Sequence, residues 1–186
     1  METKNNSALL VMDMQMGIVN RYPDVAKLAD RVAVAIEHAR KTGMHMIYVV
    51  VGFRNGMPEV SSNNKIFSGI KAAMANVDMN EWMKVLPVIA PQKDEITIVK
   101  KRISAFAGSD LEVVLRGLDV RDLTLCGIAT SGVVLSTLRE AADKDFKLTV
   151  LTDCCADADE EVHRVLTTKV FPRQADVLTA EEWIKR

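Results

Sequence analysis

Ala8-Leu9-Leu10-Val11-Met12, followed directly by Asp13, is an uninterrupted apolar run about as long as one β-strand. A strand buried on both faces, as in a parallel sheet, has this continuous pattern. Apolar residues then recur at helical spacing over residues 25–39, and Gly43 ends the predicted helix. A second apolar run, residues 46–51, completes a strand–helix–strand unit.

The same alternation continues to the end of the chain. Further strands are expected at residues 95–99, 123–126, 148–151 and 176–178, and helices at 111–118, 134–142, 157–170 and around Trp183. Ser109 and Glu112 have the spacing of a capping box before the helix at 111–118. This alternation predicts one domain over residues 1–186, a doubly wound α/β fold whose mainly parallel sheet has helices on both faces.

The least regular part of the chain is residues 52–93, which contain Gly56, Pro58, Pro87 and Pro91. One helix is expected there, near residues 70–75. Long excursions of this kind in a compact domain often cover a binding site.

Composition excludes several classes of protein. The net charge of −1 argues against a nucleic-acid or membrane-surface partner, because either surface is anionic. The start of the chain is polar and the longest apolar run is too short to span a bilayer, so a cytoplasmic protein is expected. Three cysteines, Cys126, Cys154 and Cys155, suggest no disulfide framework.

The residues that could take part in catalysis or binding lie where the predicted strands end. In parallel α/β sheets, ligands bind at the carboxyl ends of the strands. Asp13 and Lys100 occupy two such ends, and residues 127–133 and 153–156 follow two others. Burial raises the pKa of a strand-end carboxyl unless a cation compensates, although such a carboxylate also serves as a turn cap.

The stretch Gly127-Ile128-Ala129-Thr130-Ser131-Gly132 combines small residues with a strand-to-helix junction. Small residues there leave backbone N–H groups exposed at a helix start, where they stabilise an anion or a developing oxyanion. The alternative is a tight turn that needs small residues only for packing.

Together these segments resemble the isochorismatase-like hydrolase superfamily. Residues 10–15 (LVMDMQ) resemble its hydrophobic-D-x-Q opening, residues 100–106 (KKRISAF) its K-x-R-x-S-A-F segment, and residues 153–156 (DCCA) its D-A-C-A-S segment. Residues 127–130 (GIAT), with Thr137 and Ala141, resemble G-x-x-T-x-x-C-V-x-x-T-x-x-x-A. The resemblance implies a six-stranded, three-layer fold with strand order 3-2-1-4-5-6, a small-molecule substrate and a homo-oligomer.

The resemblance also implies roles for individual residues. In most members, the Asp corresponding to Asp13 deprotonates a cysteine that attacks a carbonyl, while the Lys corresponding to Lys100 stabilises charge. A cis peptide before the Thr, here Ala129–Thr130, aims N–H groups at the oxyanion. Substrate-binding positions carry over to Gln15, Phe106, Ala129, Thr130, Ser131 and Gly132.

The departure from the pattern lies at the nucleophile. Three residues beyond Thr130 the chain has Val133, and valine cannot attack a carbonyl. Isochorismatases carry glycine at this position, keep the Asp and the Lys, and hydrolyse a vinyl ether with water after the Asp protonates it. Unlike them, this chain has Ala129 where they have tyrosine, and it lacks their Gln and Arg segment after the second strand.

No metal and no other cofactor is expected. Nicotinamidase-like members hold a metal through one Asp and two His after the second strand, and residues 52–64 contain no histidine. Three hypotheses remain: a hydrolase of an unidentified small molecule that uses Asp13 and Lys100 with water as nucleophile, a non-catalytic descendant that binds a small ligand or a protein, or an amidase with a relocated thiol.

Overall fold

The computed structural model describes residues 5–22 and 24–186. Its six strands form one parallel sheet in the order β3-β2-β1-β4-β5-β6, which confirms the α/β fold and strand order implied by the resemblance. The strands are β1 (Ser7–Met12), β2 (His45–Val51), β3 (Ile96–Lys100), β4 (Asp122–Ile128), β5 (Lys147–Ala156) and β6 (Asp176–Leu178).

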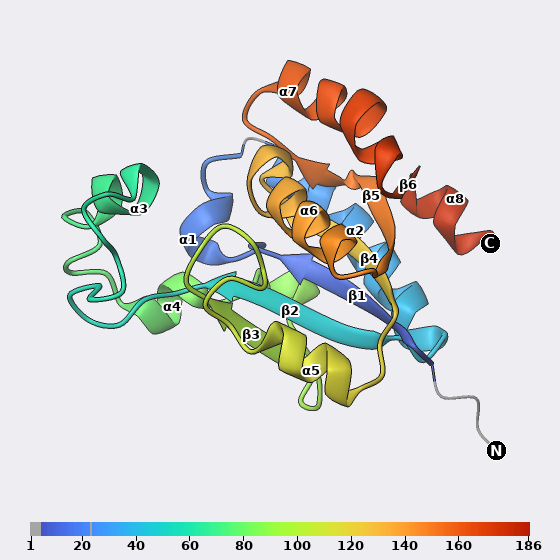
Figure 1. The fold of residues 1–186 in the computed structure, drawn as a ribbon, viewed down its shortest axis with the longest axis horizontal. Coiled ribbons are helices and arrows are strands. Elements are labelled where there is room, and N and C mark those ends of the chain that lie inside the picture. The colour runs from blue at the N-terminus through green and yellow to red at the C-terminus, as the bar shows by residue number, and fades with distance from the viewer. Residues whose placement is uncertain (1–4, 23) are drawn as a thin grey trace.

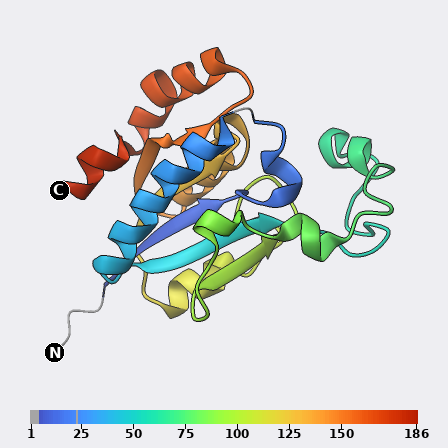
Figure 2. The ribbon, with the colours of Figure 1, turned by 180° about the vertical axis from the view of Figure 1, so that it is seen from behind.

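Helices cover both faces of the sheet. α5 and α6 lie on one face, and α2 crosses the other, where α8 packs beside it (Figures 1 and 2). The α-helices are α1 (Met16–Val19), α2 (Val25–Lys41), α3 (Lys65–Ile70), α4 (Met79–Met83), α5 (Leu111–Gly117), α6 (Leu135–Asp143), α7 (Glu160–Val165) and α8 (Ala180–Ile184). Within the described residues, no helix is long and apolar enough to cross a membrane.

The continuous apolar runs are buried because the central strands have helices above and below them. Every residue of β1 and β2 after the first is buried, as expected for a parallel sheet covered on both faces. The apolar face of α2 packs against this layer through Leu28, Val32 and Ile36. The sheet core thus holds the carboxyl ends of β1, β3 and β4 in fixed positions.

The excursion between β2 and β3 projects away from the sheet and carries α3 and α4 (Figure 1). It has a small core of its own, made by Val51, Phe53, Met57, Val60 and Phe67. The helix expected near residues 70–75 was misplaced, because α3 ends at Ile70 and turns follow. The Asn64 side chain accepts a hydrogen bond from Phe67 N (3.0 Å), which caps the helix and starts it earlier.

The predicted capping box before α5 was also wrong. Ser109 Oγ donates to Ala105 O (2.6 Å) and accepts from Leu111 N (3.3 Å), and not from Glu112 N as a capping box requires. The N-cap residue Asp110 makes no side-chain capping bond. The Glu112 carboxylate instead pairs with Lys144 Nζ at 2.6 Å, so a tertiary contact replaces the local one.

Assembly into a homo-oligomer stays a prediction.

Candidate active site

Asp13 and Lys100 form a buried ion pair at the carboxyl edge of the sheet. Asp13 directly follows β1, Lys100 is the last residue of β3, and Lys100 Nζ donates to Asp13 Oδ2 at 2.8 Å. The ammonium also donates to Ile103 O at 2.7 Å. Only 6% of Asp13 and 1% of Lys100 is exposed. The two strand-end residues singled out in the sequence therefore lie together.

The burial of this pair shifts both pKa values toward the neutral forms. Desolvation raises the pKa of Asp13 to about 6, against the opposing effect of the Lys100 charge. Desolvation likewise lowers the pKa of Lys100, although the Asp13 carboxylate acts in the other direction. A carboxyl with a pKa near 6 exchanges its proton close to neutral pH, which suits a general acid or base.

One oxygen of the Asp13 carboxyl is buried without a partner. Oδ2 is bound by Lys100, whereas Oδ1 has no hydrogen-bond partner among the described residues. An unsatisfied buried carboxyl oxygen is costly and needs an explanation such as a catalytic role or an unseen ligand. Oδ1 is therefore free to accept a proton from a ligand or to deliver one to it.

The turn after β4 lies next to Asp13, because Gly127 of β4 pairs with Met12 of β1. Gly127 has φ +132°, and a Cβ there would lie 2.0 Å from Met12 O, so this close approach requires glycine. The cis peptide joins Ile128 and Ala129, one bond earlier than the resemblance implies. A π-helical turn, Thr130–Val134, then leads into α6.

Three backbone N–H groups of this turn are already used. Ser131 N donates to Asp157 Oδ2 (2.7 Å), and the amides of Gly132 and Val134 donate to Ala129 O (3.1 and 3.3 Å). The expectation that small residues leave the N–H groups exposed was therefore wrong at these positions. The turn is π-helical and kinked, with Gly132 outside helical φ/ψ values, and its amides of Gly132 and Val134 bond the preceding residue Ala129, while Asp157 satisfies the Ser131 amide.

The side chains of Thr130 and Val133 point into the protein. Thr130 is fully buried and Val133 is 2% exposed, whereas Ser131 is exposed. Thr130 Oγ1 shares a hydrogen bond of 2.8 Å with His163 Nδ1 on α7. Neither His163 nor Asp157 was singled out by sequence reasoning, and no local pattern marks them, since both bonds join segments about 30 residues apart.

The Gln15 side chain is hydrogen-bonded to the backbone of neighbouring elements. Its amide nitrogen donates to Val51 O (3.0 Å) and Trp82 O (3.2 Å), and its amide oxygen accepts from Val51 N (2.8 Å). The residue is completely buried. Gln15 thus joins the end of β1 to β2 and to α4, and substrate binding through it stays a prediction.

The Phe106 ring packs against residues that follow α6. Its ring stacks on Phe146, with centroids 6.2 Å apart, and Lys144 Nζ lies 5.5 Å from its centroid. Both neighbours follow the C-terminal end of α6, whereas the turn Thr130–Val134 precedes its start. This placement supports a packing role for Phe106, and substrate binding through it stays a prediction.

The other residues of the K-x-R-x-S-A-F segment fix loops around the site. Lys101 Nζ donates to Gly52 O (2.8 Å), and Arg102 donates to Glu59 O (2.6 Å). Both side chains hold the excursion between β2 and β3 against the loop after β3. Ala105 N donates to Thr137 Oγ1 at 2.9 Å, which links that loop to α6.

All three cysteines are buried. The Cys126 thiol, in the middle of β4, donates to Leu10 O at 3.4 Å. Burial raises the pKa of Cys126 and of Cys154 well above the usual range, and raises the pKa of Cys155 to about 12. A reactive thiol needs a lowered pKa, so these environments do not favour the thiolate.

Among the described residues, no group of three or more His, Cys, Asp or Glu side chains is placed to hold a metal ion. Glu59 Oε2 and His45 Nε2 are further buried atoms without partners there.

Comparison with known proteins gives consistent matches over nearly the whole chain. A family model described as the isochorismatase domain matches residues 7–182. YwoC of Bacillus subtilis, an uncharacterized isochorismatase family protein, is 30% identical over 190 residues, 97% of this chain and 93% of the relative. Ureidoacrylate amidohydrolase RutB of Stutzerimonas stutzeri is 29% identical over 179 residues, 84% of this chain and 72% of the relative. A solved isochorismatase family protein from Burkholderia thailandensis has the same fold, with a TM-score of 0.83 and 24% identity over 95% of this chain and 93% of that one.

Proposed function

The chain belongs to the isochorismatase family, and from this premise we propose that it hydrolyses a small molecule with Asp13 as general acid or base and water as the nucleophile. Lys100 holds the Asp13 carboxyl in place and balances its charge. No cysteine side chain takes part. The substrate class within this proposal is an acid-labile enol ether or a small amide.

The observation that carries the proposal is the buried Asp13–Lys100 pair with a free carboxyl oxygen. Lys100 Nζ occupies Oδ2 at 2.8 Å, which leaves Oδ1 as the proton-transfer atom. With a pKa of about 6, the carboxyl is part protonated near neutral pH. It can therefore protonate a substrate carbon or oxygen, or take a proton from an attacking water.

Val133 supports water as the nucleophile. By resemblance it stands at the position of the cysteine in most members, and its buried side chain has no reactive atom. The three cysteines that the chain does have are buried, with raised pKa values. Both observations favour direct attack by water over a thioester route.

The test uses a panel of small vinyl ethers, ureido compounds and primary amides with the wild-type protein, Asp13→Asn and Lys100→Met. We expect the wild type to hydrolyse a compound of this panel. Asp13→Asn should lower that turnover by about 10²–10⁴-fold, since this is the usual contribution of a general acid–base group. Lys41→Met, which removes an exposed lysine paired with Glu37, is the control and should leave turnover unchanged. Equal turnover in Asp13→Asn would contradict the proposal.

A second candidate is a non-catalytic protein that binds a ligand at the same place. Val133 favours it, because the position that holds a cysteine in most members has no reactive atom in this chain. Saturable binding of a panel compound without turnover, weakened in Asp13→Asn, would select this candidate over the hydrolase.

A further inference from the structure

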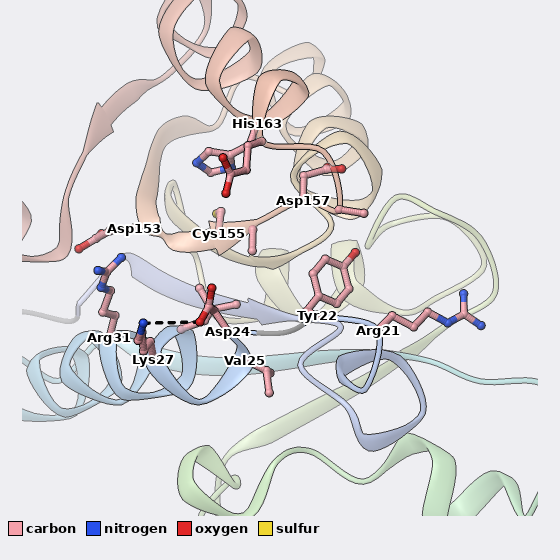
Figure 3. A pocket seen from close by; sticks show the side chains of 14 residues that line it. Arg21, Tyr22, Asp24, Val25, Lys27, Arg31, Asp153, Cys155, Asp157 and His163 are labelled. Carbon is pink, nitrogen blue, oxygen red and sulfur yellow. Dashed lines mark ion pairs between the residues drawn. The ribbon is translucent and has the colours of Figure 1, made fainter.

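A cavity of about 620 Å³ opens beside the start of α2, and neither Asp13 nor Lys100 lines it. Its walls come from Arg21 and Tyr22 before α2, from α2 itself, from the end of β5 and from the start of α7 (Figure 3). The volume falls within the roughly 300–1,000 Å³ that is typical of small-molecule sites.

The charged residues that line the cavity are unevenly divided between its walls. The α2 wall, with the turn before it, carries three cations, Arg21, Lys27 and Arg31, and one carboxylate, Asp24. The remaining lining carboxylates are Asp157 and Glu160, on the wall that includes α7, and Asp153 at the end of β5. Figure 3 shows the α2 wall below and the α7 wall above, with the space between them. On the α2 wall, cations outnumber the single carboxylate, whereas the charged groups on the α7 wall include two carboxylates.

Several of these charges are not neutralised by a neighbouring side chain. Lys27 pairs with Asp24 at 3.6 Å. Within residues 5–22 and 24–186, by contrast, Arg21, Arg31 and Glu160 form no ion pair. Tyr22, Leu28 and Ala156 supply an apolar surface in the same cavity.

From this arrangement we propose that the cavity binds a small zwitterion, an amino acid with a free ammonium and a free carboxylate group. An arginine binds a carboxylate through two parallel hydrogen bonds, and a glutamate accepts from an ammonium. A zwitterion satisfies both walls at once, whereas a singly charged ligand leaves one wall unsatisfied.

Two hydrogen bonds connect this cavity to the turn beside Asp13. His163, which lines the cavity, bonds Thr130 Oγ1 at 2.8 Å, and the carboxylate of Asp157 accepts from Ser131 N at 2.7 Å. A ligand that fixes the α7 wall therefore also stabilises the turn Thr130–Val134. The cavity is thus an effector site for the neighbouring centre.

Isothermal titration calorimetry with glycine, L-alanine and L-glutamine tests the binding, with acetate and ethylammonium as singly charged controls. At least one amino acid is expected to bind at least about tenfold tighter than either control. Arg31→Gln and Glu160→Gln should each weaken that binding about tenfold or more, because each loses a charge-assisted hydrogen bond. Lys41→Gln on α2 and Glu161→Gln on α7 do not line the cavity and should bind as the wild type does.

No saturable binding of any of the three amino acids, or equal binding of acetate, would overturn the proposal. Unchanged affinity in both Arg31→Gln and Glu160→Gln would overturn it as well. Asp13→Asn should bind the amino acid normally, so the result does not depend on whether the chain is a hydrolase. Hydrogen exchange at the Ser131 amide should slow on saturation, and an unchanged rate would contradict the link to the turn.

Discussion

Lys100 Nζ lies 2.8 Å from Asp13 Oδ2, although 87 residues separate the two in the chain and β2 runs between their strands. The parallel sheet explains this, because it brings the carboxyl ends of β1 and β3 to one edge. Each charged side chain would be costly to bury alone, so the stability of the protein should depend on both members of the pair together.

Lys100→Met should lower the free energy of unfolding by about 3–5 kcal/mol at pH 7, since it leaves the Asp13 carboxylate buried without its cation. The double variant Asp13→Asn/Lys100→Met should lose less than the sum of the two single variants. Urea denaturation gives all three values. Lys41→Met, at an exposed ion pair, should change stability by less than about 1 kcal/mol. Additive single effects would show that the pair is not coupled.

The wild-type protein should lose stability relative to Asp13→Asn as the pH rises from about 4 to about 6. Folding raises the pKa of Asp13 from 3.8 to about 6, so in this window the folded state binds more protons than the unfolded state. The stabilisation from that protonated carboxyl is fully present below the unfolded pKa and is lost as the pH rises through the folded value. Urea denaturation of both proteins between pH 3.5 and 7 measures the difference. A difference that grows in favour of the wild type over this range contradicts the raised pKa.

An iodoacetamide-type reagent should not rapidly label any cysteine of the native protein at neutral pH. Burial raises the pKa of all three thiols, to about 12 for Cys155, and only the thiolate reacts. Mass spectrometry should find three labels after unfolding in urea, which serves as the control. Fast stoichiometric labelling of native Cys154 or Cys155 would revive the hypothesis of an amidase with a relocated thiol.

Gly127→Ala should destabilise the protein strongly. The added Cβ would lie 2.0 Å from Met12 O at a φ of +132°, and neither backbone can move without breaking the β1–β4 pairing. Gly117→Ala, at the end of α5 with no atom within 4 Å of the new Cβ, is the matched control and should gain about 0.5–1 kcal/mol. Thermal unfolding compares the two, and a Gly127→Ala protein as stable as the wild type would refute this account of the turn.

Val133→Cys alone should not produce strong amidase activity. Val133 lies within a turn in which the amides of Ser131, Gly132 and Val134 are already bonded, so a new thiol there does not gain an oxyanion site from them. The variant and the wild type are assayed on the same amide panel, with Val133→Cys/Asp13→Asn as the control. High turnover in Val133→Cys that disappears in the double variant would show that an amidase site was intact except for one side chain.

The sequence predicted the architecture and the central pair well, for a physical reason. Continuous apolar runs such as residues 8–12 identify strands buried on both faces, and strand–helix alternation places their carboxyl ends at one edge. Asp13 and Lys100 were therefore expected near each other, and the ion pair confirms their proximity. Local sequence patterns predicted side-chain contacts less well where tertiary contacts compete with them. Glu112, for example, pairs with Lys144 and does not form the expected capping box.

What the tertiary structure alone decided is how polar groups around this pair are used. The amide of Gln15 is taken by Val51 and Trp82, the Phe106 ring packs on Phe146, and Asp157 accepts from the Ser131 amide. Each of these partners is distant in the chain, and each contact depends on the direction of a side chain after packing. Residue type and spacing therefore determined which strand ends carry chemistry, whereas the fold determined which polar atoms stay free, because a buried group bonds whichever partner the packing brings within reach.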